Sequence, residues 1–192
     1  MIIGVTGRSG SGKSSFSNIL KNKGFVVLDA DKIVKKLYST NKDLLLKIRK
    51  SFPEAFEGSF LYVKKLAEIV FSEVEKLLIL SEIVNPFVLE VIRLEIKKNV
   101  NKNIVIDAIT LFESGVNILC DKTVAVIANN KLCVKRIVKR DKISKDMAIK
   151  RLNSQPDCEF YKKRVDFYFE NIESFEFFEK NVEYILTLWN IS

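Results

Sequence analysis

Apolar residues are distributed along this chain in two patterns, and each pattern predicts a different kind of secondary structure. Short apolar runs are typical of buried strands, which are predicted at residues 2–6, 25–28, 103–107, 122–127 and 165–169. Apolar residues at helical spacing predict helices at residues 13–23, 32–38, 42–51, 131–140, 144–152 and 172–188. Strands that alternate with helices favour an α/β fold, in which a parallel sheet of about five strands is flanked by helices.

A long helical stretch lies between the second and third predicted strands. Apolar residues recur at helical spacing from about residue 62 to residue 98, and Pro86 interrupts the pattern. A residue that precedes proline disfavours helical geometry, so Asn85 is expected to leave the helix and two or three helices are predicted. The stretch is either an insertion that covers a substrate or a set of additional helices with a structural role only. A short helix and turn are predicted at residues 111–119.

Composition narrows the class of protein. Hydrophobic residues make up 47% of the 192 residues and charged residues 29%, which is typical of a globular protein. The first residues enter a strand directly instead of forming a signal peptide, and a cytoplasmic location is expected. The net charge of +8 favours anionic partners such as nucleic acid, a membrane surface or phosphorylated metabolites. No nucleic-acid recognition module and no membrane span accompany this charge, so neither a nucleic acid nor a membrane is expected as a partner.

The cysteine and histidine content limits the possible chemistry. Cys120, Cys133 and Cys158 lie too far apart to form a metal-ligand motif, and their odd number argues against a disulfide framework. The chain contains no histidine. Any general base must therefore be a carboxylate, a lysine, a tyrosine or a cysteine.

A glycine-rich segment follows the first predicted strand. The sequence GRSGSGKS at Gly7–Ser14 fits the pattern G-x-x-x-x-G-K-[ST] and lies between a strand and a helix. Its glycines let the backbone approach a phosphate, which backbone N–H groups then surround at the start of the helix. Lys13 is expected to reach the β- and γ-phosphates, and Ser14 to ligate Mg²⁺. The residues expected to bind ATP here are Gly10, Ser11, Gly12, Lys13, Ser14 and Ser15.

Acidic residues follow two of the predicted strands, where ligands gather in a parallel sheet. Asp107 ends the third strand, and it either holds magnesium through a water molecule or belongs to a turn. Asp29 and Asp31 follow the second strand. Asp31 is the candidate general base, because phosphorylation of an alcohol requires removal of its proton. Alternatively, either aspartate caps the helix that begins near residue 32.

Basic residues cluster on the helix predicted at residues 131–140. Arg136 and Arg140 are four positions apart and share a helix face. Arginines placed here in a kinase with this phosphate loop close over the nucleotide and neutralise charge in the transition state. Both are therefore expected to bind ATP, and Arg151 is a further candidate. The alternative is a basic helix face in contact with solvent.

Taken together, these motifs resemble the dephospho-CoA kinase family over nearly the whole chain. The shared elements are Gly7–Ser14, Asp29-Ala30-Asp31, Leu66–Pro86, Asp107–Gly115, Asp121–Val126, Arg136, Arg140-Asp141 and Arg151–Gln155. The sequence LFESG at residues 111–115, with Asp121 and the later Arg-Asp pair, is more specific to that family than the phosphate loop. The resemblance implies a single P-loop NTPase domain over residues 1–192, with a helical insertion at about 60–98 and a lid at about 131–152.

The resemblance also implies a reaction and residue roles. A kinase of this family transfers a phosphoryl group from ATP, with Mg²⁺, to the ribose 3′-hydroxyl of dephospho-CoA, which is the last step of coenzyme A synthesis. The implied catalytic residues are Lys13, Asp31 and Arg140. The implied acceptor-binding residues are Asp31, Asn85, Leu111 and Glu113. Ser14 and, through water, Asp107 are the implied magnesium ligands.

Three positions depart from the family pattern. The family usually has a glycine where Arg8 stands and a histidine where Asn85 precedes Pro86. An arginine that is usual near the start of the insertion is replaced by Lys64 or Lys65, and lysine lacks the planar fork that grips a phosphate at two points. These departures bear on acceptor affinity more than on the type of reaction.

Two other functions remain open at this point. One is another small P-loop kinase that acts on a nucleoside, a nucleotide or a small alcohol. The other is a nucleotide-dependent switch or a nucleic-acid-associated ATPase, which predicts hydrolysis without an acceptor or salt-sensitive binding to nucleic acid. The chain lacks the N-K-x-D sequence that specifies guanine, which argues against a GTPase switch.

Overall fold

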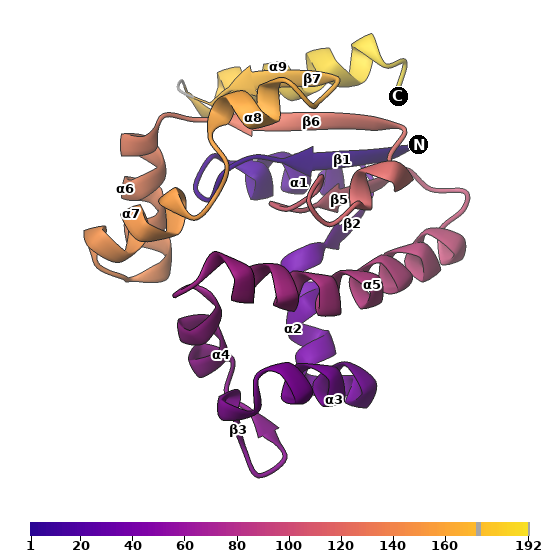
Figure 1. Ribbon diagram of the computed structural model, residues 1–192. Coiled ribbons are helices and arrows are strands. Elements are labelled where there is room, and N and C mark those ends of the chain that lie inside the picture. The colour runs from indigo at the N-terminus through magenta and orange to yellow at the C-terminus, as the bar shows by residue number, and fades with distance from the viewer. Residues whose placement is uncertain (172–173, 192) are drawn as a thin grey trace. The chain divides into compact units, whose positions relative to one another are not determined.

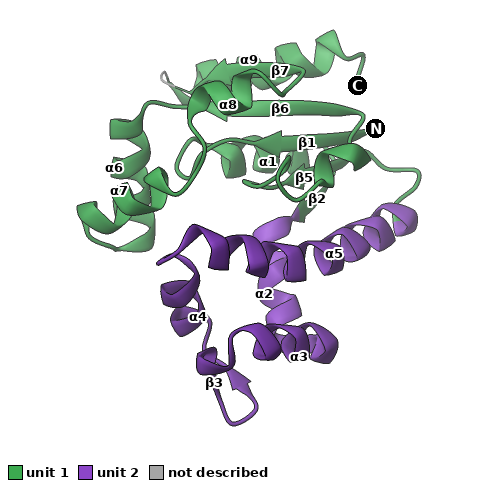
Figure 2. Ribbon diagram, viewed as in Figure 1, with its two compact units in different colours: residues 1–28, 99–192 green, residues 29–98 purple. Residues whose placement is uncertain are grey.

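The computed structural model describes residues 1–171 and 174–191. The chain forms two compact units, of which the first comprises residues 1–28 and 99–192 and the second residues 29–98 (Figure 2). The second unit therefore begins further toward the N-terminus than the insertion expected at about 60–98.

The first unit is built on a five-stranded sheet (Figure 1). Its strands are β1 (Ile2–Thr6), β2 (Val26–Asp29), β5 (Ile104–Asp107), β6 (Lys122–Ile127) and β7 (Phe167–Glu170). Their order is β2-β5-β1-β6-β7, and β1 pairs in parallel with both β5 and β6. The parallel sheet of about five strands expected from the sequence is confirmed, and the ends of β1, β5 and β6 meet at one edge.

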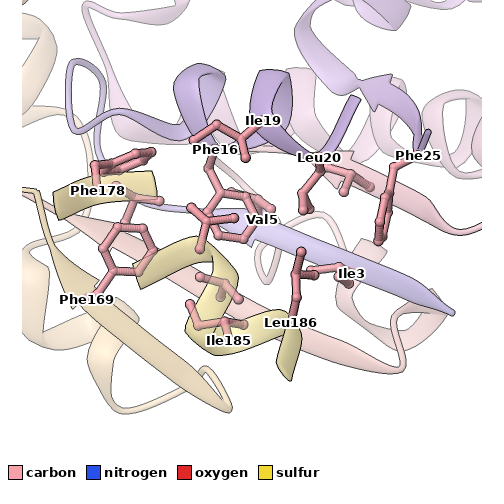
Figure 3. Close-up of a cluster of buried hydrophobic side chains, with 14 residues drawn as sticks. Ile3, Val5, Phe16, Ile19, Leu20, Phe25, Phe169, Phe178, Ile185 and Leu186 are labelled. Carbon is pink, nitrogen blue, oxygen red and sulfur yellow. The ribbon is translucent and has the colours of Figure 1, made fainter. Parts of the chain in front are cut away.

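One face of this sheet packs against α1 (Lys13–Asn22) and α9 (Phe175–Leu188) (Figure 3). Aromatic rings form the centre of the cluster: Phe16 of α1 lies 6.0 Å from Phe169, and Phe169 lies 5.1 Å from Phe178, between ring centroids. Burial of each such side chain contributes roughly 1.5–3 kcal/mol to folding. This packing fixes α1, and with it the loop that precedes α1, against the sheet.

The other face of the sheet is covered by shorter segments. Tyr161 of α8 (Cys158–Lys162) is fully buried against Ala125 and Ile127 of β6. The 3₁₀ helix η2 (Val116–Leu119) lies in the turn-rich segment after β5. Here Leu111 packs on Gly4, where a Cβ atom would come within 2.9 Å of the leucine side chain.

A helical hairpin follows β6 in the first unit (Figure 1). It consists of α6 (Asn130–Asp141) and α7 (Lys145–Asn153), which were predicted at residues 131–140 and 144–152. The two helices share a small core of their own, which includes Cys133, Ile137, Ala148 and Leu152. The helix predicted at residues 172–188 corresponds to α9, and residues 172 and 173 lie outside the described part of the chain.

The second unit is mainly helical. Its helices are α2 (Ala30–Thr40), α3 (Lys42–Ser51), η1 (Pro53–Ala55), α4 (Val63–Val70) and α5 (Val74–Lys98). A small hairpin, β3 (Phe56–Glu57) with β4 (Phe60–Leu61), precedes α4 and was not predicted. Helix α5 packs against α2, α3 and α4.

The expected break at Pro86 is wrong, because α5 continues through this residue and Asn85 is helical. A proline inside a helix costs about 3 kcal/mol through a lost hydrogen bond and a steric clash. Val84, Val88 and Ile92 are buried at four-residue spacing on either side of the proline. We infer that burial of this continuous face outweighs the cost. Within the described residues, no helix is both long and apolar enough to cross a membrane.

Candidate functional site

The phosphate loop joins β1 to α1 with three glycines in the left-handed region of backbone conformation. Gly12, at φ 118°, is the residue that caps the start of α1. A Cβ atom at Gly12 would collide with the side-chain amide of Asn171, and one at Gly10 would lie 2.7 Å from the carbonyl oxygen of Cys133. The loop therefore needs glycine at both positions, since other parts of the first unit approach its backbone closely.

A cavity of about 450 Å³ opens beside this loop. It is lined by Gly10, Gly12, Lys13, Ser14, Ser15, Arg136, Lys139 and Arg140. Within the described part of the chain, the buried hydroxyl of Ser11 has no hydrogen-bond partner. A helix N-terminus, basic side chains and a buried hydroxyl provide hydrogen-bond donors for a polyanion. The residues present therefore fit a nucleoside triphosphate. The structure thus brings together all the residues predicted to bind ATP except Ser11, which lies in the same loop.

Two side chains hold the outer edge of the loop. Arg136 donates to the carbonyl oxygens of Gly10 and Ser11 at 3.2 and 3.1 Å, and Asn171 donates to that of Ser11 at 2.7 Å. Arg136 also donates to the side-chain oxygen of Asn171 at 3.5 Å. Because a trans peptide directs its N–H opposite to its carbonyl, the N–H of Gly12 points away from both side chains. These donors thus fix the orientation of the loop peptides and engage oxygens that would repel a phosphate.

The pKa of a nearby thiol is raised mainly by burial and is affected to a smaller extent by positive charges at the loop. Burial raises the pKa of Cys133, whereas the charges of Arg8, Arg136 and Lys13 lower it by smaller amounts. Lys13 is itself buried and donates to the carbonyl oxygen of Arg8 at 3.2 Å. Three cations therefore act on one region of the first unit, next to the cavity.

Asp107 lies at the end of β5 and contacts α1. The hydroxyl of Ser17 donates to a carboxylate oxygen of Asp107 at 2.9 Å. Ser14 is three residues before Ser17 on the same helix, so both hydroxyls lie on one side of α1. Ser14 is exposed and lines the cavity. A serine hydroxyl and a nearby carboxylate are oxygen donors of the type that Mg²⁺ prefers.

The two arginines of α6 differ in their partners. Arg136 is half-buried and bound to the loop, as described above, which argues against a face that only contacts solvent. Arg140 is exposed and donates twice to Asp141, at 2.7 and 2.9 Å. Arg151 of α7 donates to the same carboxylate at 2.7 Å. Hydrogen bonds from Arg140, together with the charges of both arginines, hold the pKa of Asp141 below its usual value.

The two aspartates after β2 take different places. Asp29 is the N-cap of α2, because its side chain accepts a hydrogen bond from the backbone N–H of Lys32 at 3.0 Å. Its carboxylate also lies 3.2 Å from the Lys32 ammonium. Asp31 is exposed in the first turn of α2, in the second unit. The alternative that one aspartate caps the helix is thus settled in favour of Asp29.

The other residues expected to bind an acceptor lie in varied surroundings. Asn85 is half-buried in the middle of α5. Leu111 is fully buried and packs against Gly4 of β1, so its side chain lies in the interior of the first unit. Glu113 is exposed, but its pKa is raised, mainly by desolvation. The backbone N–H groups of residues 112 and 113 and the charge of Arg164 oppose this shift.

Sequence reasoning missed the role of Asn171. This residue follows β7 directly, and the rule that singled out Asp29 and Asp107 after their strands could have found it. The contribution of Ser17 to the surroundings of Asp107 was also missed. Ser17 gives no local signal, because it is one polar residue among several on α1.

Comparisons with known proteins place this chain among relatives of one family. The model of a family described as dephospho-CoA kinase matches residues 1–176. A dephospho-CoA kinase of Fusobacterium nucleatum subsp. nucleatum is 40% identical over 95% of this chain and 95% of its own length. One from Bacillus licheniformis is 33% identical over 99% of this chain and 97% of its own length.

Solved structures give the same result. The crystal structure of TT1252 from Thermus thermophilus superimposes with a TM-score of 0.83 at 30% identity, over 97% of this chain and 96% of that one. Dephospho-CoA kinase from Campylobacter jejuni gives a TM-score of 0.68, also at 30% identity, over 97% and 95%. Shikimate kinase from Bacteroides thetaiotaomicron, at 15% identity and a TM-score of 0.57 over 100% and 99%, shares the fold.

Proposed function

Because this chain belongs to the dephospho-CoA kinase family, we propose that it transfers the γ-phosphoryl group of ATP to the ribose 3′-hydroxyl of dephospho-CoA. The family consists of ATP-dependent transferases, and its reaction completes the synthesis of coenzyme A. The observation that carries the proposal is the match over residues 1–176, which includes a phosphate loop beside a basic cavity. A cytoplasmic location suits an enzyme that uses ATP.

In this proposal ATP is bound by the phosphate loop and by the α6–α7 hairpin, which corresponds to the lid predicted at about residues 131–152. The backbone of Gly10–Ser14 holds the β- and γ-phosphates, and the ammonium of Lys13 neutralises the charge that develops on them. Arg140, which lines the same cavity, acts from the lid. Arg136 keeps the loop in its binding conformation through the two carbonyl oxygens that it engages. Catalysis by these groups consists mainly of positioning and charge stabilisation.

Magnesium would be held by the Ser14 hydroxyl and, through water, by Asp107. When bound, the ion neutralises charge on the phosphates and orients them. The hydrogen bond from Ser17 fixes the direction of the Asp107 carboxylate, which is the contribution of this chain to that arrangement.

Asp31 accepts the proton of the attacking hydroxyl. Since Asp29 caps α2, the cap does not depend on Asp31, whose carboxylate is exposed in the same helical turn. A histidine cannot serve as the base, because the chain has none. Asn85 and Glu113 are the other residues that we propose to contact the acceptor, with Leu111 supporting the segment that carries Glu113.

The proposal is tested by measuring ADP release from ATP and Mg²⁺ with dephospho-CoA and, separately, with nucleosides, nucleoside monophosphates and shikimate. Only dephospho-CoA should give turnover. In Asp31→Asn, kcat should fall by about 10²- to 10⁴-fold, the usual contribution of a general base, while the Kd for ATP stays the same.

Asp29→Asn is the matched control, since it alters a neighbouring carboxylate that serves as a helix cap. It should retain most of the activity. Turnover of a different acceptor would identify another small kinase, and ATP hydrolysis without any acceptor would indicate a switch or an ATPase. Equal losses of kcat in the two variants would show that Asp31 is not the general base.

A further inference from the structure

The phosphate loop carries a buried arginine at position 8. The Arg8 residue is 6% exposed. Its guanidinium donates from Nη1 to the side-chain oxygen of Asn130 at 2.6 Å, and from Nη2 to the backbone carbonyl of Leu152. Asn130 begins α6, and Leu152 lies in the last turn of α7. One side chain of the loop is therefore bound to both helices of the hairpin.

The environment of Arg8 is specific to arginine. Two acceptors on different helices match the planar fork of a guanidinium, and the ammonium of a lysine lacks that fork. The Nε atom is buried with no hydrogen-bond partner in the described part of the chain, so the side chain is held at some cost. The backbone of Arg8 lies outside the left-handed region, and its conformation does not require glycine.

A second pair of contacts joins the same two parts. The backbone N–H of Ser9 donates to the Gln155 side chain at 2.8 Å, and Gln155 donates back to the Ser9 hydroxyl at 2.8 Å. Gln155 follows α7 directly. Residues 8 and 9 are thus fixed to the base of the hairpin, whereas Arg136 and Asn171 hold the loop at Gly10 and Ser11.

We propose that Arg8 is a positioning residue for phosphoryl transfer, which fixes the base of the α6–α7 hairpin to the phosphate loop and so sets the place of Arg140. Arg140 is ten residues beyond Asn130 on α6, or about 15 Å along the helix axis. A small rotation at the base therefore moves Arg140 by a larger distance. The inference rests on the proposed function, because it assumes that Arg140 acts on the transferred group.

The test compares Arg8→Gly, Arg8→Lys and Asn130→Ala with the unmodified enzyme. Since a misplacement of about 1 Å can cost about 100-fold in rate, kcat in Arg8→Gly should fall by at least about ten-fold. The Kd for ADP, measured by calorimetry, should change by less than about three-fold, because Arg136 and Asn171 still hold the loop. Arg8→Lys should recover only part of the loss. Millimolar guanidinium should partly restore kcat in Arg8→Gly and leave the unmodified enzyme unaffected.

Asn130→Ala keeps the test informative if the arginine variants do not fold. It removes one acceptor, and kcat should fall without a matching change in the Kd for ADP. Asn129→Ala is the control, since Asn129 is the N-cap of α6 and accepts from Leu132 instead of Arg8. In the double variant Arg8→Gly/Asn130→Ala, kcat should be no lower than in Arg8→Gly alone.

Three results would overturn the inference: an unchanged kcat in both Arg8→Gly and Asn130→Ala, equal changes in kcat and in the Kd for ADP, or a lower unfolding temperature as the sole effect. The proposed function fails separately. In that case the unmodified enzyme binds ADP but does not turn over dephospho-CoA in the same assay.

Discussion

The phosphate loop in the first unit and the start of α2 in the second are held in different ways. Side chains from three later segments of the chain bind the loop: Arg136 from α6, Gln155 after α7 and Asn171 after β7. The first turn of α2 is fixed by local contacts, in which Asp29 bonds to Lys32 three residues away. The two regions contain the proposed ATP-binding residues and the proposed base.

Nucleotide binding and proton removal therefore depend differently on the rest of the protein. A loop bound by distant segments is preorganised, so its donors need little rearrangement when phosphates bind. A carboxylate in an exposed helical turn has few neighbours that fix it. Substitutions around the loop should therefore affect nucleotide affinity from several distant positions, whereas substitutions near Asp31 should act only locally.

Among substitutions in and around the phosphate loop, the largest effect is expected for Lys13→Ala. It removes the buried ammonium that is proposed to neutralise charge on the phosphates, so kcat/KM should fall by about 10²- to 10³-fold. The Kd for ATP, measured by calorimetry, should also rise, in contrast to Asp31→Asn. Lys23→Ala, which removes an exposed partner of Glu183, serves as the control and should retain activity. An unchanged Kd in Lys13→Ala would show that nucleotide binding does not depend on this lysine.

A smaller effect is expected for Asn171→Ala. The change removes one of the two donors to the carbonyl oxygen of Ser11, and a hydrogen bond of this kind contributes about 0.5–1.5 kcal/mol. The KM for ATP should rise by up to about ten-fold, and the KM for the acceptor should not change. Asn181→Ala removes a side-chain to carbonyl hydrogen bond at an exposed site of α9 and should leave both KM values unchanged. Equal changes in the two KM values would show that Asn171 does not act specifically on nucleotide binding.

The smallest effect concerns the lid and its dependence on pH. The pKa of Asp141 is lowered in the folded protein, so its ion pairs add stability above the usual carboxyl pKa of 3.8. That contribution is lost as the pH falls through the lower, folded value. Arg140 and Arg151 are 55% and 44% exposed, so solvent screening limits the contribution to about 1 kcal/mol or less.

Urea unfolding of the unmodified protein and of Asp141→Asn measures this contribution. The difference in free energy of unfolding should be constant well above the usual carboxyl pKa and should disappear as the pH falls below the lowered pKa of the folded protein. A difference that grows as the pH falls would have the wrong sign for a carboxylate with a lowered pKa.

Much of the fold could be predicted because local patterns determine it. The ranges predicted for β1, α3 and β6 are those observed, since each is an apolar or amphipathic run followed within two residues by a glycine, a proline or an asparagine. The β3–β4 hairpin was missed, because strands of two residues are too short to show alternation. The path of α5 through Pro86 was also missed, because packing of the whole helix overrides a local preference.

The candidate site divides in the same way. The glycine-rich motif identified the loop, since its glycines and Lys13 are adjacent in the sequence. The contacts that hold the loop join residues far apart in the chain, such as Ser11 with Asn171, and no local pattern encodes them. Whether Asp29 or Asp31 caps α2 depended on the position at which the helix begins, which sequence patterns place only within a few residues.

The order of the strands has a consequence for how the protein folds. β1 pairs with β5 from Ile2 opposite Ile104 onward, and the whole second unit lies between them in sequence. During synthesis, β1 therefore emerges long before β5 and β6, its two partners in the sheet. Pairings of such large sequence separation slow folding, and the apolar residues of β1 remain unpaired meanwhile. The helical unit forms from contacts within residues 29–98, so it can fold before the sheet is complete.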